Sequence, residues 1–132
     1  MTLKTTDFSF LIILAIFALI AGCQSGTSGP TELLNKYFDS AIKQDYATTY
    51  TCYYDAYKAK VSRDEFVRHR KEASALQSYK IISVTMPDGN SAVAEVQLTF
   101  GPSEKLNRKG PVTVNLKEEL IKEKGEWKIK VW

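Results

Sequence analysis

Few residues of this 132-residue chain could form a structural zinc site or act as thiol nucleophiles. There are two cysteines, Cys23 and Cys52, and one histidine, His69. A structural zinc site needs four Cys or His ligands at short spacings, and these three residues do not supply them. Neither a metal nor a cofactor is therefore expected. Cys52 is expected to be a buried thiol, because free cysteine is among the most buried residue types. A reactive or intermolecular thiol is the alternative.

The other thiol, Cys23, directly follows Leu19-Ile20-Ala21-Gly22. An aliphatic residue, two small residues and then a cysteine resemble the lipobox of bacterial lipoproteins. In that family a diacylglycerol is attached to the cysteine thiol, and the chain is cut just before it. The resemblance implies cleavage between Gly22 and Cys23, acylation of Cys23 with palmitate-type chains, and a membrane anchor that holds the domain in the cell envelope, outside the cytoplasm.

Residues 1–22 also have the pattern of a signal peptide. The apolar run from Phe10 to Ile20 is 11 residues long. A bilayer-spanning helix needs about 20 apolar residues, whereas the apolar core of a signal peptide needs about 7–15. An uncleaved anchor and secretion without lipid are the alternatives. Residues 23–29 are small, polar and glycine-bearing, which predicts a flexible tether between the anchor and the domain.

Residues 30–132 predict one small α+β domain that begins with three helices. The apolar spacing predicts a first helix over 31–44. Asp45 is the expected N-cap of a second helix, and Ser62 that of a third over 63–75. The second helix carries five tyrosines in residues 46–57. These aromatic side chains either pack against the core or line a ligand pocket.

From Tyr79 onward the apolar residues alternate with a period of two, which predicts four strands. Asp88-Gly89 predicts the hairpin between the first two. In the third strand, which begins at Val112, Glu118 interrupts the alternation, and a β-bulge near Glu118-Glu119 is the expected cause. The predicted strands span 79–86, 92–100, a segment from 112 onward, and 127–131.

This order of elements resembles the nuclear-transport-factor-2-like (cystatin-like) fold, and more narrowly the small bacterial lipoproteins whose domain of that fold has no assigned function. The resemblance is carried by Asp45-Tyr46, the Tyr50 region, the helix start from Ser62 to Phe66, the hairpin at Asp88-Gly89, and Gly125-Glu126-Trp127-Lys128-Ile129. It implies three N-terminal helices packed on a curved, four-stranded antiparallel meander sheet that encloses a conical cavity.

Relatives of this fold do different things with the cavity, so the fold alone does not choose a function. Proton-transfer enzymes of the fold place an acid, or an acid and a histidine, beside a tyrosine. The candidates here would be Asp55 and His69 with Tyr50 or Tyr54. Because His69 lies among basic residues, which favours solvent exposure, the chain is expected not to be an enzyme and to have no catalytic residue.

Two binding functions remain. The lipid anchor and the lack of a catalytic set favour an interaction or scaffold domain that meets an envelope protein. The alternative is a small apolar ligand in the cavity, with Tyr50, Tyr54, Phe100 and Trp127 as the expected pocket residues. The net charge of +3 is spread along the chain. A nucleic-acid partner is not expected, because a duplex-binding domain usually shows a concentrated basic stripe.

Overall fold

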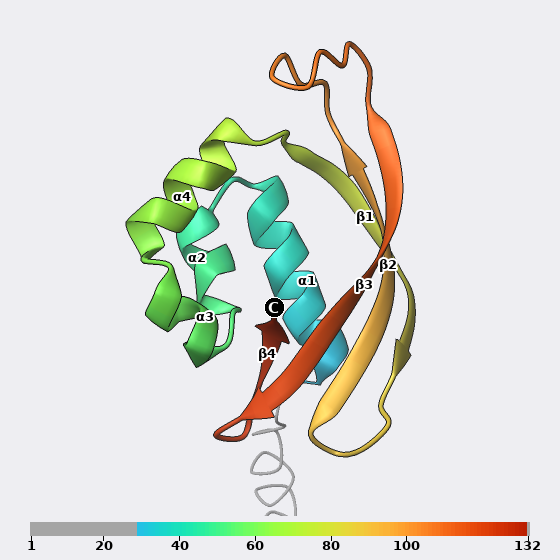
Figure 1. Ribbon diagram of the computed structural model, residues 1–132. Helices are drawn as coiled ribbons and strands as arrows, with labels where there is room; N and C mark the ends of the chain where they lie inside the picture. Colours follow the sequence, from blue (N-terminus) through green and yellow to red (C-terminus); the bar gives the residue numbers. More distant parts are fainter. Residues whose placement is uncertain (1–28, 132) are drawn as a thin grey trace, which may run out of the picture.

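Four helices lie on one face of a four-stranded antiparallel sheet (Figure 1) in the computed structural model, which describes residues 29–131. The strand order is β1-β2-β3-β4, so the predicted α+β class and the meander order are confirmed. The helices are α1 (Pro30–Ile42), α2 (Tyr46–Thr51), α3 (Asp55–Lys60) and α4 (Arg63–Glu72), and the strands are β1 (Leu76–Thr85), β2 (Ser91–Phe100), β3 (Val112–Glu123) and β4 (Glu126–Lys130).

The prediction of three helices is wrong, because the tyrosine-rich stretch forms two helices, α2 and α3, instead of one. Between them the chain runs beside β4. The Tyr54 amide donates to the Ile129 carbonyl at 3.0 Å, and the Ile129 amide donates to the Cys52 carbonyl at 2.7 Å. These hydrogen bonds replace the helical ones and cover the free edge of β4. Their partner lies more than seventy residues away in sequence, so local spacing could not reveal the break.

Both predicted N-caps are confirmed. The Asp45 side chain accepts a hydrogen bond from the Thr48 amide at the start of α2, and the Ser62 hydroxyl accepts one from the Glu65 amide at the start of α4. Each satisfies a backbone donor that the first turn of a helix leaves without a partner.

The predicted bulge near Glu118-Glu119 is also wrong. Strands β2 and β3 pair without a register shift from Ser91↔Ile121 to Phe100↔Val112. In this register Glu118 lies opposite Ala94, which is fully buried, so both side chains share the face that the helices cover. The alternation is therefore regular, and Glu118 is a polar residue on an apolar face. The register shifts that do occur lie in β1.

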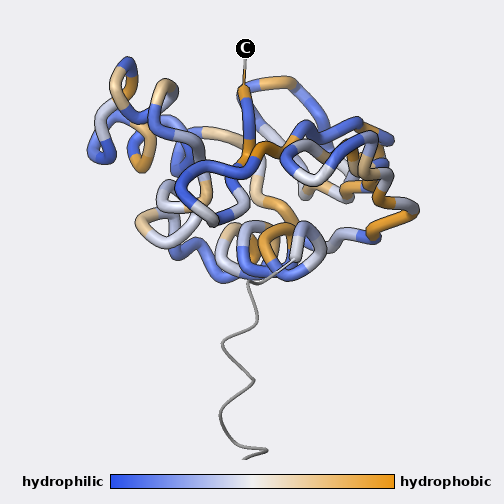
Figure 2. Tube along the Cα trace, turned by 90° about the horizontal axis from the view of Figure 1, so that it is seen from below, coloured by the Kyte–Doolittle hydropathy of each residue, from blue (hydrophilic) through white to orange (hydrophobic). Residues whose placement is uncertain are grey.

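The core lies between α1 and the helix-facing side of β2. Leu34 is 0 % exposed and Phe38 is 1 % exposed, and they face the buried row from Ala92 to Leu98. In Figure 2, hydrophobic and hydrophilic segments alternate along the chain, as expected for elements that each bury one side. The buried hydrophobic residues of the described chain all lie between Leu33 and Ile129. The domain therefore contains its own core.

Candidate functional site

A cavity of about 150 Å³, here called the inner cavity, lies between the helices and the sheet. Its wall is somewhat more apolar than polar, and five side chains bring polar or charged groups to it: Tyr37, Tyr46, Arg70, Ser74 and Glu118. An engineered apolar cavity of about this size binds benzene. The apolar and aromatic lining residues are Tyr37, Phe38, Ala41, Tyr46, Leu76, Leu98, Phe100 and Leu116.

Two tyrosines and an arginine form a hydrogen-bonded cluster at this cavity. The Tyr37 and Tyr53 hydroxyls are 2.6 Å apart. Nη2 of Arg70 donates to both, at 3.0 Å to Tyr37 and 2.8 Å to Tyr53. Burial raises the pKa of Tyr37 well above its ordinary value, so its hydroxyl keeps its proton at neutral pH. The cluster joins α1, the segment between α2 and α3, and α4.

Helix α4 positions Arg70 through its aromatic neighbour. Phe66 and Arg70 are four residues apart and thus lie on one side of the helix. The Arg70 guanidinium carbon is 5.2 Å from the centroid of the Phe66 ring, a distance that allows a cation–π interaction. Phe66 is buried against the rings of Tyr50, Tyr53 and Tyr57. The aromatic packing therefore fixes the position of the cation.

Glu118 brings an acidic group to the same cavity from β3. Within the described chain, its carboxylate makes no hydrogen bond and no ion pair, although Arg70 and Tyr37 are near enough to interact with its charge. Burial raises the pKa of Glu118, and the positive charge of Arg70 opposes that rise. The carboxylate is thus an acceptor without a protein donor, and its oxygens keep some contact with solvent, because the described chain has no fully buried side-chain oxygen that lacks a partner.

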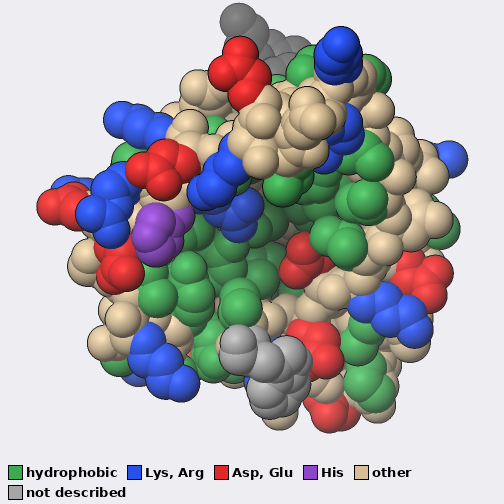
Figure 3. All heavy atoms as spheres, turned by 45° about the horizontal axis from the view of Figure 1, so that its top comes forward, with side chains coloured by type: hydrophobic (Ala, Val, Ile, Leu, Met, Phe, Trp, Pro, Cys, Tyr) green, Lys and Arg blue, Asp and Glu red, His purple; other side chains and the backbone are tan. Residues whose placement is uncertain are grey.

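A second and wider space of about 460 Å³, here called the outer hollow, adjoins the inner cavity and shares three of its lining residues, Arg70, Ser74 and Phe100. Figure 3 shows hydrophobic side chains gathered in a hollow of the surface, with charged side chains around it. The rest of its wall comes from the end of α4 and the residue after it, the loop 101–111 and the start of β3: His69, Glu72, Ala73, Ser103, Lys105, Leu106, Arg108, Val112 and Val114.

Arg108 holds the loop 101–111 in place. Its Nη2 donates to the Gly101 carbonyl at 2.6 Å and to the Ser74 hydroxyl at 3.3 Å, and its Nε donates to the Gly110 carbonyl at 3.2 Å. This fixes the loop that forms one side of the outer hollow. Leu106, in the same loop, is 65 % exposed.

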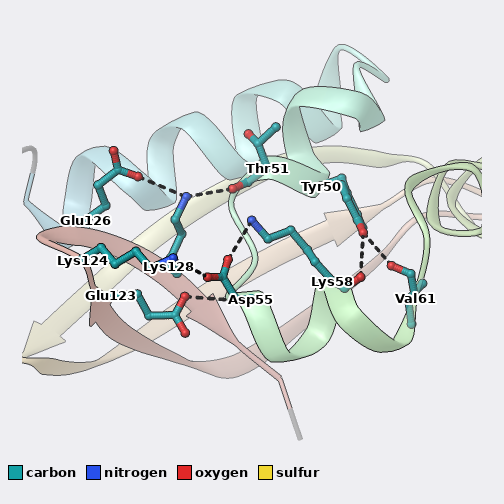
Figure 4. A network of polar contacts seen from close by, with 9 residues as sticks. All are labelled: Tyr50, Thr51, Asp55, Lys58, Val61, Glu123, Lys124, Glu126 and Lys128. Carbon is teal, nitrogen blue, oxygen red and sulfur yellow. Dashed lines mark hydrogen bonds and ion pairs between the residues drawn. The ribbon is translucent and has the colours of Figure 1, made fainter.

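The structure does not bring the four expected pocket residues together. Phe100 lines both the inner cavity and the outer hollow. Trp127 lines a separate hollow beside Cys52. Tyr50 and Tyr54 are not among the lining residues of the inner cavity. The Tyr50 hydroxyl donates to the carbonyls of Lys58 and Val61 (Figure 4), and that of Tyr54 donates to the Val131 carbonyl.

The proton-transfer candidates also lie elsewhere. Asp55 is exposed, at the start of α3, and forms ion pairs with Lys58 and Lys124 at 3.4 and 3.5 Å (Figure 4). The hydrogen bond from Lys58 holds the pKa of Asp55 below its ordinary value. His69 is exposed on α4 and lines the outer hollow. Neither residue lines the inner cavity.

The lipidation site at Cys23 and the cleavage site at Gly22 lie outside the described residues. Cys52 is 1 % exposed, and burial raises the pKa of its thiol, so it carries neither the exposure nor the thiolate character of a reactive cysteine. Between residues 29 and 131, His, Cys, Asp and Glu side chains do not form a group of three or more that could hold a metal ion. Over the same residues, each helix is too short or too polar to cross a membrane.

Sequence reasoning missed Tyr37, Arg70 and Glu118 as site residues. Tyr37 fits an ordinary apolar helix stripe, and Arg70 lies in a basic run that is typical of a solvated helix face. The sequence contains one signal for Glu118, because it lies in phase with the apolar residues Val112, Val114 and Leu120. A charged residue in phase with an apolar strand face could have indicated the cavity, but it was interpreted as the sign of a bulge.

No family model matches the sequence, and no curated protein matches it. Solved structures are similar over most of the chain. A SEC-C motif-containing protein from Psychrobacter arcticus matches at 9 % identity with a TM-score of 0.64, over 99 % of this chain and 75 % of that one. Another SEC-C motif protein, from Rhodopseudomonas palustris, matches at 15 % identity with a TM-score of 0.62, over 87 % of this chain and 84 % of that one.

An NTF-2 like protein of unknown function from Shewanella oneidensis MR-1 matches at 13 % identity with a TM-score of 0.52, over 75 % of this chain and 89 % of that one. At these identities the similarity shows the fold alone. It supports the expected small α+β domain, with a fold similar to that of the NTF-2 like protein, and it carries no activity from those proteins to this chain.

Proposed function

We propose that this chain is a lipid-anchored protein of the cell envelope whose domain binds a small, mainly apolar ligand in the inner cavity, without converting it chemically. The observation that supports this most is the inner cavity itself, whose wall combines apolar side chains with a few converging polar groups and which has a wider hollow beside it. Pockets for small molecules have this composition. A cone-like enclosure by sheet and helices, as the fold resemblance implies, suits such a ligand.

The anchor at Cys23 rests on the sequence from Leu19 to Cys23. The arrangement of the domain is compatible with it. Helix α1 begins at the end of the domain opposite to the loop 101–111, which borders the outer hollow (Figure 1). An anchor attached ahead of α1 would therefore leave the outer hollow accessible.

Native mass spectrometry of the protein, gently extracted from its own host, tests both parts. We expect a chain that begins at Cys23 with added lipid mass, and a non-covalent small-molecule adduct. A chain that still begins at Met1 would contradict the anchor. An adduct with another protein, and no small molecule, would favour the interaction or scaffold function instead.

A cavity-filling variant shows where the adduct binds. Ala41 lines the inner cavity from α1, so Ala41→Leu should fill part of it and remove the adduct. Ala47→Leu is the matched control, because Ala47 is exposed on α2 and outside the cavity lining. Loss of the adduct in both variants, or in neither, would contradict binding in the inner cavity.

A further inference from the structure

The hydrogen-bond inventory of the inner cavity indicates what its ligand must carry. The two phenol oxygens of Tyr37 and Tyr53 each accept a hydrogen bond from Arg70, and only one of the two hydroxyls can donate to the other. One hydroxyl hydrogen is therefore left over. Within the described chain, neither hydroxyl has a further hydrogen-bond partner.

The position of the two rings decides which hydrogen that is. Tyr53 is buried, is 3 % exposed and is not among the residues that line the inner cavity, whereas Tyr37 lines it. A buried donor without an acceptor costs about 1–3 kcal/mol. The favoured arrangement therefore has Tyr53 donating to Tyr37, and Tyr37 donating into the cavity.

Glu118 supplies the complementary group. Its carboxylate lines the same cavity and receives no hydrogen bond from the described chain. Beside the remaining N–H groups of Arg70 and the hydroxyls of Ser74 and Tyr46, the cavity thus presents a donor on Tyr37 and a carboxylate acceptor on Glu118. A ligand group that accepts from the first and donates to the second would satisfy both.

The charges at the cavity disfavour an ionic ligand. Arg70 and Glu118 both line it, so a cation meets the guanidinium and an anion meets the carboxylate. A neutral ligand avoids both repulsions. The volume of about 150 Å³ leaves room for one six-membered ring.

We propose that the inner cavity selects a neutral ring compound with a hydroxyl group, which donates its hydrogen bond to Glu118 and accepts one from Tyr37. This inference rests on the proposed function and specifies its ligand class. Glu118 is the specificity-determining residue, because a hydrogen bond to a charged group discriminates more strongly than one between neutral groups.

Phenol and toluene are matched probes, since they have nearly the same shape and differ in a hydroxyl against a methyl group. The protein for this experiment is the chain of residues 23–132 with Cys23→Ser, which keeps every buried core residue. Because it carries no lipid, it needs no detergent. Dissociation constants come from the shifts of backbone amide resonances at Phe38 and Leu98, which line the cavity. We expect phenol to bind about tenfold more tightly than toluene, the discrimination that one hydrogen bond to a charged group provides.

Glu118→Met removes the acceptor at similar size and should reverse this preference, so that toluene binds more tightly. Tyr37→Phe should weaken phenol binding and leave toluene binding unchanged. Glu119→Met is the control, because Glu119 lies on the opposite face of β3 and pairs with Lys130. It should keep the preference of the unmodified chain. Melting curves show whether each variant folds. If either Glu118→Met or Tyr37→Phe does not fold, the other one of the two still tests the inference.

The outcomes separate this inference from the proposed function. Toluene binding as tightly as phenol, or an unchanged preference in Glu118→Met, overturns the inference while the cavity remains a ligand site. If neither probe shifts the amide resonances of Phe38 and Leu98, both this inference and the proposed function are overturned.

Discussion

At the scale of single residues, the unusual feature is a set of polar groups inside an apolar domain. Tyr37, Tyr53 and Arg70 hydrogen-bond one another through three close contacts, which leave one hydroxyl hydrogen without an acceptor in the cluster. Glu118 has no such partner in the described chain. Buried polar groups are costly unless they are hydrogen-bonded. The first three residues therefore stabilise the fold, and Glu118 weakens it.

Tyr53→Phe should lower the free energy of unfolding by about 2 kcal/mol, because it removes two buried hydrogen bonds, one of them to a charged group. The measurement is urea denaturation at pH 7. Tyr57→Phe is the matched control: its ring stacks on Tyr53 at 4.5 Å, but no hydrogen bond of its hydroxyl is found in the described chain. Equal losses in the two variants would show that the cluster does not stabilise the domain.

Glu118→Gln should raise the free energy of unfolding at neutral pH by about 1 kcal/mol, because it removes a partly buried charge that has no ion-pair partner. Burial raises the pKa of Glu118 above its ordinary value of 4.5, so the folded chain binds this proton more tightly than the unfolded chain. The unmodified chain therefore loses this contribution to its stability as the pH rises from 4.5 through the pKa that Glu118 has in the folded chain.

The advantage of Glu118→Gln should thus vanish below pH 4.5 and grow above it, when both chains are denatured in urea at a series of pH values. Glu119→Gln, on the outer face of the same strand, serves as the control. A constant difference between Glu118→Gln and the unmodified chain at every pH would contradict the raised pKa.

At the scale of elements, helix ends and strand pairing decide where the site residues lie. Asp45 and Ser62 begin α2 and α4, and the caps were predictable because they act within four residues. The break between α2 and α3 depends on Ile129, far away in sequence. It places Tyr53 against the core, at the point where it meets Arg70.

Asp45→Ala should lower the free energy of unfolding by about 1 kcal/mol, because the Thr48 amide and hydroxyl lose their acceptor. Asp45→Asn should recover most of this, since asparagine caps helices about as well. Thermal unfolding monitored by circular dichroism gives both values. If Asp45→Asn and Asp45→Ala lower the stability by the same amount, the side chain does not act as a cap.

At the scale of the whole molecule, the helices and the sheet share one core, which surrounds the inner cavity without filling it. Leu34 and Phe38 of α1 lie in this core with the buried row of β2. Because the buried hydrophobic residues of the described chain lie between Leu33 and Ile129, we expect the domain to unfold as a single cooperative unit.

Leu34→Ala should cost about 3 kcal/mol, because it leaves a void at a position that is 0 % exposed. Leu106→Ala, at a position that is 65 % exposed, should change the free energy of unfolding by less than about 0.5 kcal/mol. Urea denaturation followed by both tryptophan fluorescence and circular dichroism should give coincident curves. Separate transitions for the two probes would contradict a single core.

The sequence by itself determined the class of the domain, the order of its strands and two helix starts, because apolar periodicity, turn residues and caps act over short distances. The expected anchor at Cys23 is likewise a local pattern, and it stays a prediction. Only the tertiary structure decided that α2 and α3 are separate, that Glu118 lies in phase on the buried face, and that Tyr37, Arg70 and Glu118 line one cavity. These facts depend on contacts between residues that are distant in the chain, and a single sequence does not show which distant residues meet.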